Sequence, residues 1–146
     1  MTTLRRVFAV IAMLANASAH AAADDRIVDE MLKRTEGITA QDIRRDYDAC
    51  DSGVTFSMRL CASYRWTEQD VRLDAVYRRL RAQVGKDDLP ALVHAQRAWL
   101  AYRDAQCAIE GKAGAGGGSA EGLYVLSCKE DLTRQQADRL SAMAHE

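Results

Sequence analysis

The chain has 146 residues and a nearly balanced charge, with 20 lysines and arginines against 21 aspartates and glutamates. Nucleic-acid binding needs a basic surface that displaces counterions from phosphates, so this composition gives no support for a nucleic-acid partner. The chain contains one proline, and its apolar residues recur with helical spacing rather than the alternation of strands. We therefore expect an all-α fold, a small helical bundle or hairpin.

The first element in the chain has the three-part pattern of a secretory signal peptide. Arg5 and Arg6 form a positive start, an apolar run too short to span a membrane follows, and residues 17–21 offer small-x-small cleavage patterns. We expect a signal peptide over residues 1–22, cleaved near residues 19–23. Because no cysteine lies there to accept a lipid, the product is expected in the periplasm or secreted, without a membrane anchor. Losing two arginines leaves 18 basic against 21 acidic residues, a net charge of −3.

Two short helices are expected next, over residues 26–34 and 41–49. Thr39 precedes the second and is a plausible N-cap, because its hydroxyl can accept a hydrogen bond from a free amide of the first turn. Their apolar content is modest. We interpret residues 23–49 as an N-terminal helical extension and residues 50–146 as the main helical domain.

The four cysteines all follow the predicted signal peptide, at Cys50, Cys61, Cys107 and Cys128. An even number of cysteines in an oxidising compartment predicts two disulfides. Three connectivities are possible, and the sequence does not choose among them; we favour the local pairs Cys50–Cys61 and Cys107–Cys128. A continuous helix between the first two would hold its ends about 16 Å apart, beyond disulfide reach, so that pair requires Gly53 to break the helix. The spacing does not resemble a zinc site, and we expect no metal and no cofactor.

Three longer helices are expected after Cys50. The first ends near Gly85, which suits a left-handed C-terminal cap. The second starts near Asp88, which can cap free amides, and continues to Cys107. Beyond Gly111 the glycines of residues 114–118 predict a loop, and Ser119 is expected to cap the last helix.

A set of motifs runs through these three helices in a fixed order. They are Leu73-Asp74-Ala75-Val76-Tyr77-Arg78-Arg79-Leu80, Gln96-Arg97-Ala98-Trp99, Tyr102-Arg103-Asp104, Cys107, Gly117-Gly118-Ser119, Cys128, Leu132-Thr133 and Leu140. Together they resemble the LprI-type lysozyme-inhibitor domain, a small cysteine-containing helical module of exported bacterial proteins. The resemblance covers roughly residues 50–140 and implies an envelope protein that inhibits lysozyme, although one domain can serve several functions. Asp74 stands where the family usually has asparagine, so a different partner is expected there.

The polar and aromatic motif residues allow a structural and a functional interpretation. They are Asp74, Tyr77, Gln96, Arg97, Trp99, Tyr102, Arg103 and Asp104. Arg103 lies four residues from both Trp99 and Cys107, so it shares the stripe that faces the core or a groove. A buried guanidinium needs a partner, and the structural interpretation pairs Arg103 with Asp74. Gln96, Tyr77 and Trp99 either pack in the core or contact a ligand, whereas Arg97 and Asp104 are expected on a solvated side.

The glycine-rich loop is the candidate for binding a partner protein. Its proposed contact residues are Gly116, Gly117, Gly118, Ser119 and Tyr124. Lysozyme presents two carboxylates in a cleft, and glycines let a backbone approach such a cleft closely. In this hypothesis Ser119 hydrogen-bonds a catalytic carboxylate and Tyr124 contacts the rim. The alternative is that Ser119 only caps the final helix and the glycines only permit the turn.

The sequence contains no recognisable catalytic constellation. There is no nucleophile elbow, and cysteines in disulfides cannot act as thiolate nucleophiles. The favoured hypothesis is therefore an inhibitor that binds and occludes lysozyme or another peptidoglycan hydrolase. The alternatives are an immunity factor against a peptidoglycan-degrading toxin, and an envelope binding or scaffold module that recognises a small ligand or periplasmic protein. A deep groove lined by Gln96, Arg103 and Tyr77 would favour the binding module, and burial of those side chains would favour the inhibitor.

Overall fold

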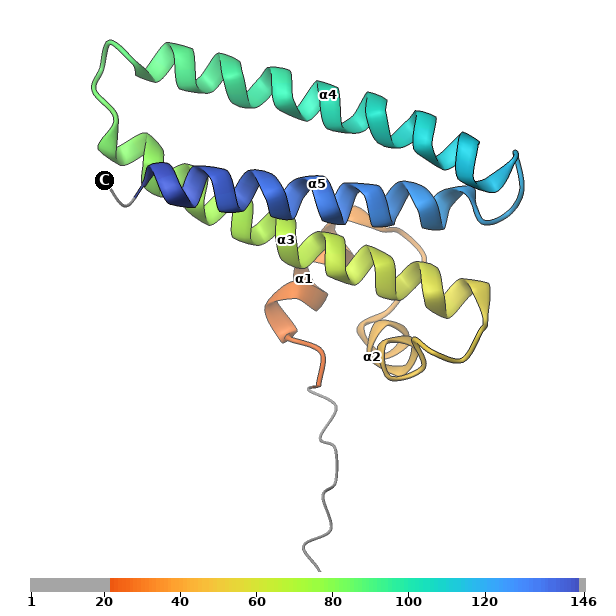
Figure 1. Cartoon of the computed structure of the whole chain (residues 1–146). Coiled ribbons are helices and arrows are strands. Elements are labelled where there is room, and N and C mark those ends of the chain that lie inside the picture. The colour runs from red at the N-terminus through yellow and green to blue at the C-terminus, as the bar shows by residue number, and fades with distance from the viewer. Residues whose placement is uncertain (1–21, 145–146) are drawn as a thin grey trace, which may run out of the picture.

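The computed structural model describes residues 22–144, which form five α-helices and no strand (Figure 1). The all-α expectation is confirmed. The predicted signal peptide lies almost entirely outside the described residues. None of the five helices combines the length and the apolar character that crossing a bilayer requires.

Three long helices, α3 (Thr55–Gln83), α4 (Leu89–Ala115) and α5 (Glu121–Met143), form the main body. Helix α5 packs closely against both α3 and α4, whereas α3 and α4 approach each other little. The three therefore lie in the order α4, α5, α3, with α3 and α5 pointing the same way and α4 reversed (Figure 1). A side chain that joins α3 to α4 must consequently reach past α5.

Two short helices, α1 (Asp25–Arg34) and α2 (Ala40–Asp48), pack against α3. Thr39 caps α2 as predicted, in a capping box in which Thr39 and Asp42 satisfy each other's backbone amides. The helices share an apolar core with α3, made of Ile27, Val28, Met31, Ile43, Leu60 and Tyr64. Residues 23–49 are thus packed on the main helices through buried side chains.

Both local disulfides are present, Cys50–Cys61 and Cys107–Cys128. The chain leaves helical geometry between α2 and α3, and Gly53 adopts a φ of +74° there, as the first pair requires. In the loop-entropy view each bridge stabilises the fold by about 3 kcal/mol. One disulfide joins the α2–α3 connection to α3, and the other joins α4 to α5.

Three predicted helix ends are wrong in detail. Gly85 is not left-handed, because α3 ends at Gln83 and the turn closes through backbone bonds from the amides of Asp88 and Leu89 to the Gly85 carbonyl. Asp88 does precede α4, but its side chain makes no cap hydrogen bond. Ser119 does not cap α5 either: the N-cap position is Ala120, and the Glu121 amide bonds the Gly118 carbonyl.

Helix α4 also runs further than the glycines predict, through Gly111 and Gly114 to Ala115. Both glycines face α5. A Cβ on Gly111 would meet Val125 and the Glu121 backbone, and one on Gly114 would meet the Tyr124 ring. The close approach of two helices therefore explains these glycines, and the loop shrinks to residues 116–120.

Candidate functional site

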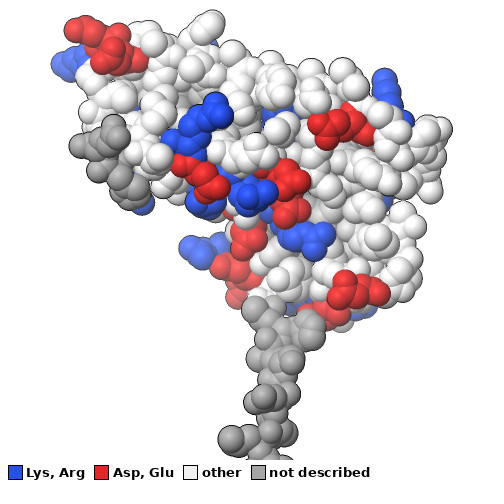
Figure 2. Space-filling model, viewed as in Figure 1, with Lys and Arg blue, Asp and Glu red and all other residues white. Residues whose placement is uncertain are grey.

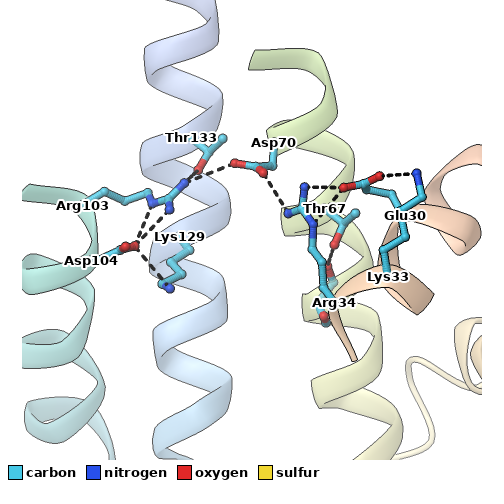
Figure 3. A network of polar contacts seen from close by, with 10 residues as sticks. Glu30, Lys33, Arg34, Thr67, Asp70, Arg103, Asp104, Lys129 and Thr133 are labelled. Carbon is cyan, nitrogen blue, oxygen red and sulfur yellow. Dashed lines mark hydrogen bonds and ion pairs between the residues drawn. The ribbon is translucent and has the colours of Figure 1, made fainter. Parts of the chain in front are cut away.

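Arg103 is the centre of a polar cluster that joins the three long helices. It is a buried charged residue, with only 6% of its surface exposed. Its Nη1 donates to Asp70 Oδ1 on α3 and to Thr133 Oγ1 on α5, both at 3.3 Å. Its Nε and Nη2 donate to Asp104 Oδ1 on α4 (Figure 3). The guanidinium also lies 5.6 Å and 5.4 Å from the ring centroids of Trp66 and Trp99, within cation–π range. The structural interpretation of Arg103 is therefore the one that the geometry favours.

The predicted partner of Arg103 was wrong by one helical turn. Asp70 takes the place expected for Asp74, whose carboxylate instead bonds Arg78 at 2.8 Å on the same helix. Asp70 and Asp74 lie four residues apart and so share a face of α3. Helix spacing predicts that face. Which turn of α3 lies level with Arg103 of α4 depends on how both helices pack against α5.

The cluster continues from Asp70 to α1 (Figure 3). Asp70 Oδ2 accepts from Arg34 Nη1 at 2.8 Å, and Arg34 also bonds Glu30, which accepts from Lys33. Hydrogen bonds from Lys33 and Arg34 lower the pKa of Glu30 below its ordinary value. A chain of paired charges therefore connects α1 to the centre of the bundle.

Asp104 was expected on a solvated side, and it is exposed, as is Arg97. It is nevertheless paired, with Arg103 at 3.0 Å and with Lys129 of α5 at 3.3 Å. Partial burial acts to raise the pKa of Asp104, but the charges and hydrogen bonds of Arg103 and Lys129 outweigh it and leave that pKa below the ordinary value. Figure 2 shows charges of both signs interleaved on the face turned toward the viewer, without a large field of one sign.

The remaining motif residues divide between core and groove. Tyr77 and Trp99 are partly buried against a second apolar core, made of Leu73, Val76, Leu80, Ala137, Leu140 and Ala144. Gln96 is 8% exposed, and its Oε1 accepts from Gln136 Nε2 on α5. Tyr102 lies on the outside of α4 and is 56% exposed. Gln96 and Tyr77 also line a groove of about 470 Å³, but Arg103 does not, so the groove expected for a binding module is present only in part.

The glycine turn between α4 and α5 is exposed from Gly116 to Ser119. Gly116 and Gly117 have φ values of +57° and +80°, and the Gly118 amide bonds the Ala115 carbonyl at 2.9 Å. Tyr124, 47% exposed, lies one turn into α5. The predicted contact residues therefore share one end of the bundle, as a tight turn rather than a long loop. The Cys107–Cys128 bridge crosses between the helices about two turns away.

At the same end, exposed apolar side chains that were not predicted accompany Tyr124, which was. Val54 and Phe56 stand at the start of α3, Ile109 lies in the last two turns of α4, and Tyr124 lies at the start of α5; all four are large and exposed. The exposure of Ile109 could have been predicted from the sequence, because it lies two residues from the inward-facing Cys107 and therefore on the opposite side of α4. No comparable signal marks Phe56.

Comparison with known proteins adds a family to this geometry. The family model described as Lysozyme inhibitor LprI matches residues 47–140, which span α3, α4, both disulfides and most of α5. The uncharacterized protein R02472 of Rhizobium meliloti (strain 1021) is 33% identical over 108 residues, covering 64% of this chain and 77% of that protein. No solved structure matches the chain. With a family match over most of its length, the chain belongs to the LprI lysozyme inhibitor family.

Proposed function

We propose that this protein is exported and inhibits a peptidoglycan hydrolase such as lysozyme by binding and occluding it, without catalysis of its own. Membership of an inhibitor family supports the activity. The single structural observation that supports the contact surface is the exposed glycine turn, Gly116–Ser119, presented at the end of a disulfide-bridged helix pair.

The turn has the chemistry that insertion into a cleft requires. Glycines expose their backbone and let it approach a partner closely. Ser119 makes no cap hydrogen bond to α5, so its hydroxyl is available to a carboxylate of the target. Because the turn is short and joined to two packed helices, little conformational entropy is lost when it binds.

The apolar side chains around the turn extend this surface. A stable protein–protein interface buries about 800 Å² on each partner, more than a five-residue turn can supply. Tyr124, Ile109 and Phe56 project from three different helices at this end. Aromatic side chains are frequent binding hot spots, so Tyr124 is the proposed anchor.

The test is inhibition of a c-type lysozyme by the purified, oxidised protein, measured as lysis of a peptidoglycan suspension. We compare Tyr124→Ala with Tyr102→Ala, a change of the same residue type at similar exposure on the outside of α4. We expect dose-dependent inhibition that Tyr124→Ala weakens about tenfold or more and Tyr102→Ala leaves unchanged.

Other results would revise the proposal in defined ways. Inhibition that is equally strong in both variants would retain the function and reject the turn as the contact surface. Absence of inhibition against c-type lysozyme, together with inhibition of a bacterial muramidase or amidase, would change the target. Absence against all three would reject the proposed function.

A further inference from the structure

We infer that the groove between α1, α3 and α4 binds an uncharged saccharide. Its volume of about 470 Å³ falls within the range of about 300–1,000 Å³ typical of small-molecule sites. The lining residues are Glu30, Arg34, Asp70, Val71, Leu73, Asp74, Tyr77, Gln96 and Leu100. The groove is separate from the glycine turn, because Gln96 and Gly116 are about 30 Å apart along α4 at 1.5 Å per residue.

The charged groups of the groove disfavour a ligand that would bind through an ion pair. Arg34 bonds both Glu30 and Asp70, and the other oxygen of Asp70 bonds Arg103. Asp74, the remaining acid of the lining, is paired with Arg78. Every ionised group that lines the groove therefore has a partner of opposite sign, and an added anion or cation would have to compete with an existing pair.

Two neutral hydrogen-bonding groups of the groove have no partner within the described part of the chain. Gln96 uses its Oε1 to accept from Gln136, while its Nε2 makes no hydrogen bond among residues 22–144. The Tyr77 hydroxyl also makes none there. Neither group is among the buried polar atoms that lack a partner, so both remain accessible from the groove, where the amide can donate to an acceptor oxygen of a ligand and the hydroxyl can donate or accept.

The remaining lining residues are apolar and can pack against the C–H faces of a sugar. Val71, Leu73 and Leu100 provide apolar contact beside the Tyr77 ring. A saccharide presents C–H faces together with hydroxyl and, in N-acetylated sugars, amide oxygens that accept hydrogen bonds. Apolar walls with a few convergent neutral polar groups are the usual composition of a small-ligand site.

The test is titration of the ¹⁵N-labelled, oxidised protein with tri-N-acetylchitotriose, followed by NMR. We expect backbone amide shifts concentrated in residues 70–77 and 96–100. Tyr77→Phe removes only the hydroxyl, and Gln96→Met removes the amide at similar volume; each should weaken binding about fivefold, the value of one hydrogen bond. Tyr102→Phe, the same change outside the groove, should leave the affinity unchanged. The cationic, deacetylated chitotriose should bind no more tightly than the neutral trimer.

The inference is overturned if no shifts appear up to about 10 mM sugar, well beyond the roughly 1 mM scale of weak binding. Shifts at the glycine turn alone, or tighter binding of the cationic trimer, would also overturn it. If Gln96→Met fails to fold, unchanged affinity in Tyr77→Phe is sufficient to reject the groove. Tyr77 and Gln96 lie outside the proposed inhibitory surface, so lysozyme inhibition does not affect this result.

Discussion

The region where α1 and α2 cover α3 differs from the middle of the α3–α5 bundle in what it buries. The first encloses mainly apolar residues and a tyrosine, including Val28 and Met31. Its buried polar pair, Asp46 and Ser57, bond each other at the edge between α2 and α3. The second encloses Arg103, Thr133 and Gln96. An apolar core accepts many arrangements of suitable size, whereas a buried guanidinium needs partners at defined positions. The comparison indicates that burial attaches α1 and α2, while the polar cluster sets how the long helices align.

The largest effect that this comparison predicts is for Arg103→Ala. The change removes the buried guanidinium between Trp66 and Trp99. It also leaves Thr133 without its donor and leaves Asp70 only its bond to Arg34, and we expect the free energy of unfolding to fall by about 4 kcal/mol. Urea unfolding measures it. Arg72→Ala is the control, because Arg72 also joins two helices, by pairing with Asp138, but both side chains are about half exposed. It should cost less than about 1 kcal/mol. If both variants lowered the free energy of unfolding equally, the buried cluster would stabilise the bundle no more than an exposed ion pair does.

The sequence predicted part of this cluster for a physical reason. Spacing from Trp99 and Cys107 places Arg103 on the inner face of α4, and the cost of a buried charge requires a partner. The identity of that partner could not follow, because Asp70 and Asp74 share a face of α3 and differ only in height. Thr133 supplies an acceptor from a third helix, and no local pattern in α5 indicates which residue meets Arg103.

The next effect concerns Met31→Ala in the apolar region. Met31 is almost completely buried between α1 and α3, so we expect a loss of about 3 kcal/mol in the free energy of unfolding. Leu32→Ala is the control. The Leu32 side chain is next to Met31 in the sequence but only partly buried, so its removal should lower the free energy of unfolding clearly less. Thermal and urea unfolding should show a single transition for both. A second, earlier transition in Met31→Ala alone would mean that α1 and α2 unfold separately, contrary to a shared core.

The glycines of α4 show where local reasoning reached its limit. Glycine is the weakest ordinary helix former, so Gly111 and Gly114 predicted the end of the helix. The helix continues because both positions face α5, where a side chain would collide. Packing between distant segments therefore overrides propensity here, and the sequence of α4 alone does not contain the partner that explains it. The exposed glycines, Gly116 and Gly117, do form the expected turn.

The smallest predicted effect is the difference in stability between Gly111→Ala and Gly114→Ala, which change the two glycines within α4. Alanine is favoured over glycine in a helix by about 1 kcal/mol. At Gly111 the new methyl group would collide with Val125 and lie 3.2 Å from the Glu121 carbonyl oxygen, so overpacking should exceed this gain and leave a net loss of about 1 kcal/mol. At Gly114 the obstacle is the Tyr124 ring, at 2.8 Å.

Because the Tyr124 ring is half exposed, it can rotate toward solvent, and Gly114→Ala should leave the free energy of unfolding unchanged or raise it by up to about 1 kcal/mol. Urea unfolding of both variants, with wild type alongside, measures the difference in sign. If Gly111→Ala stabilises the protein as much as Gly114→Ala does, α4 and α5 can separate slightly at no cost. The close contact at Gly111 would then not hold these helices at their observed separation, and their alignment would rest on the Arg103 cluster and the Cys107–Cys128 bridge.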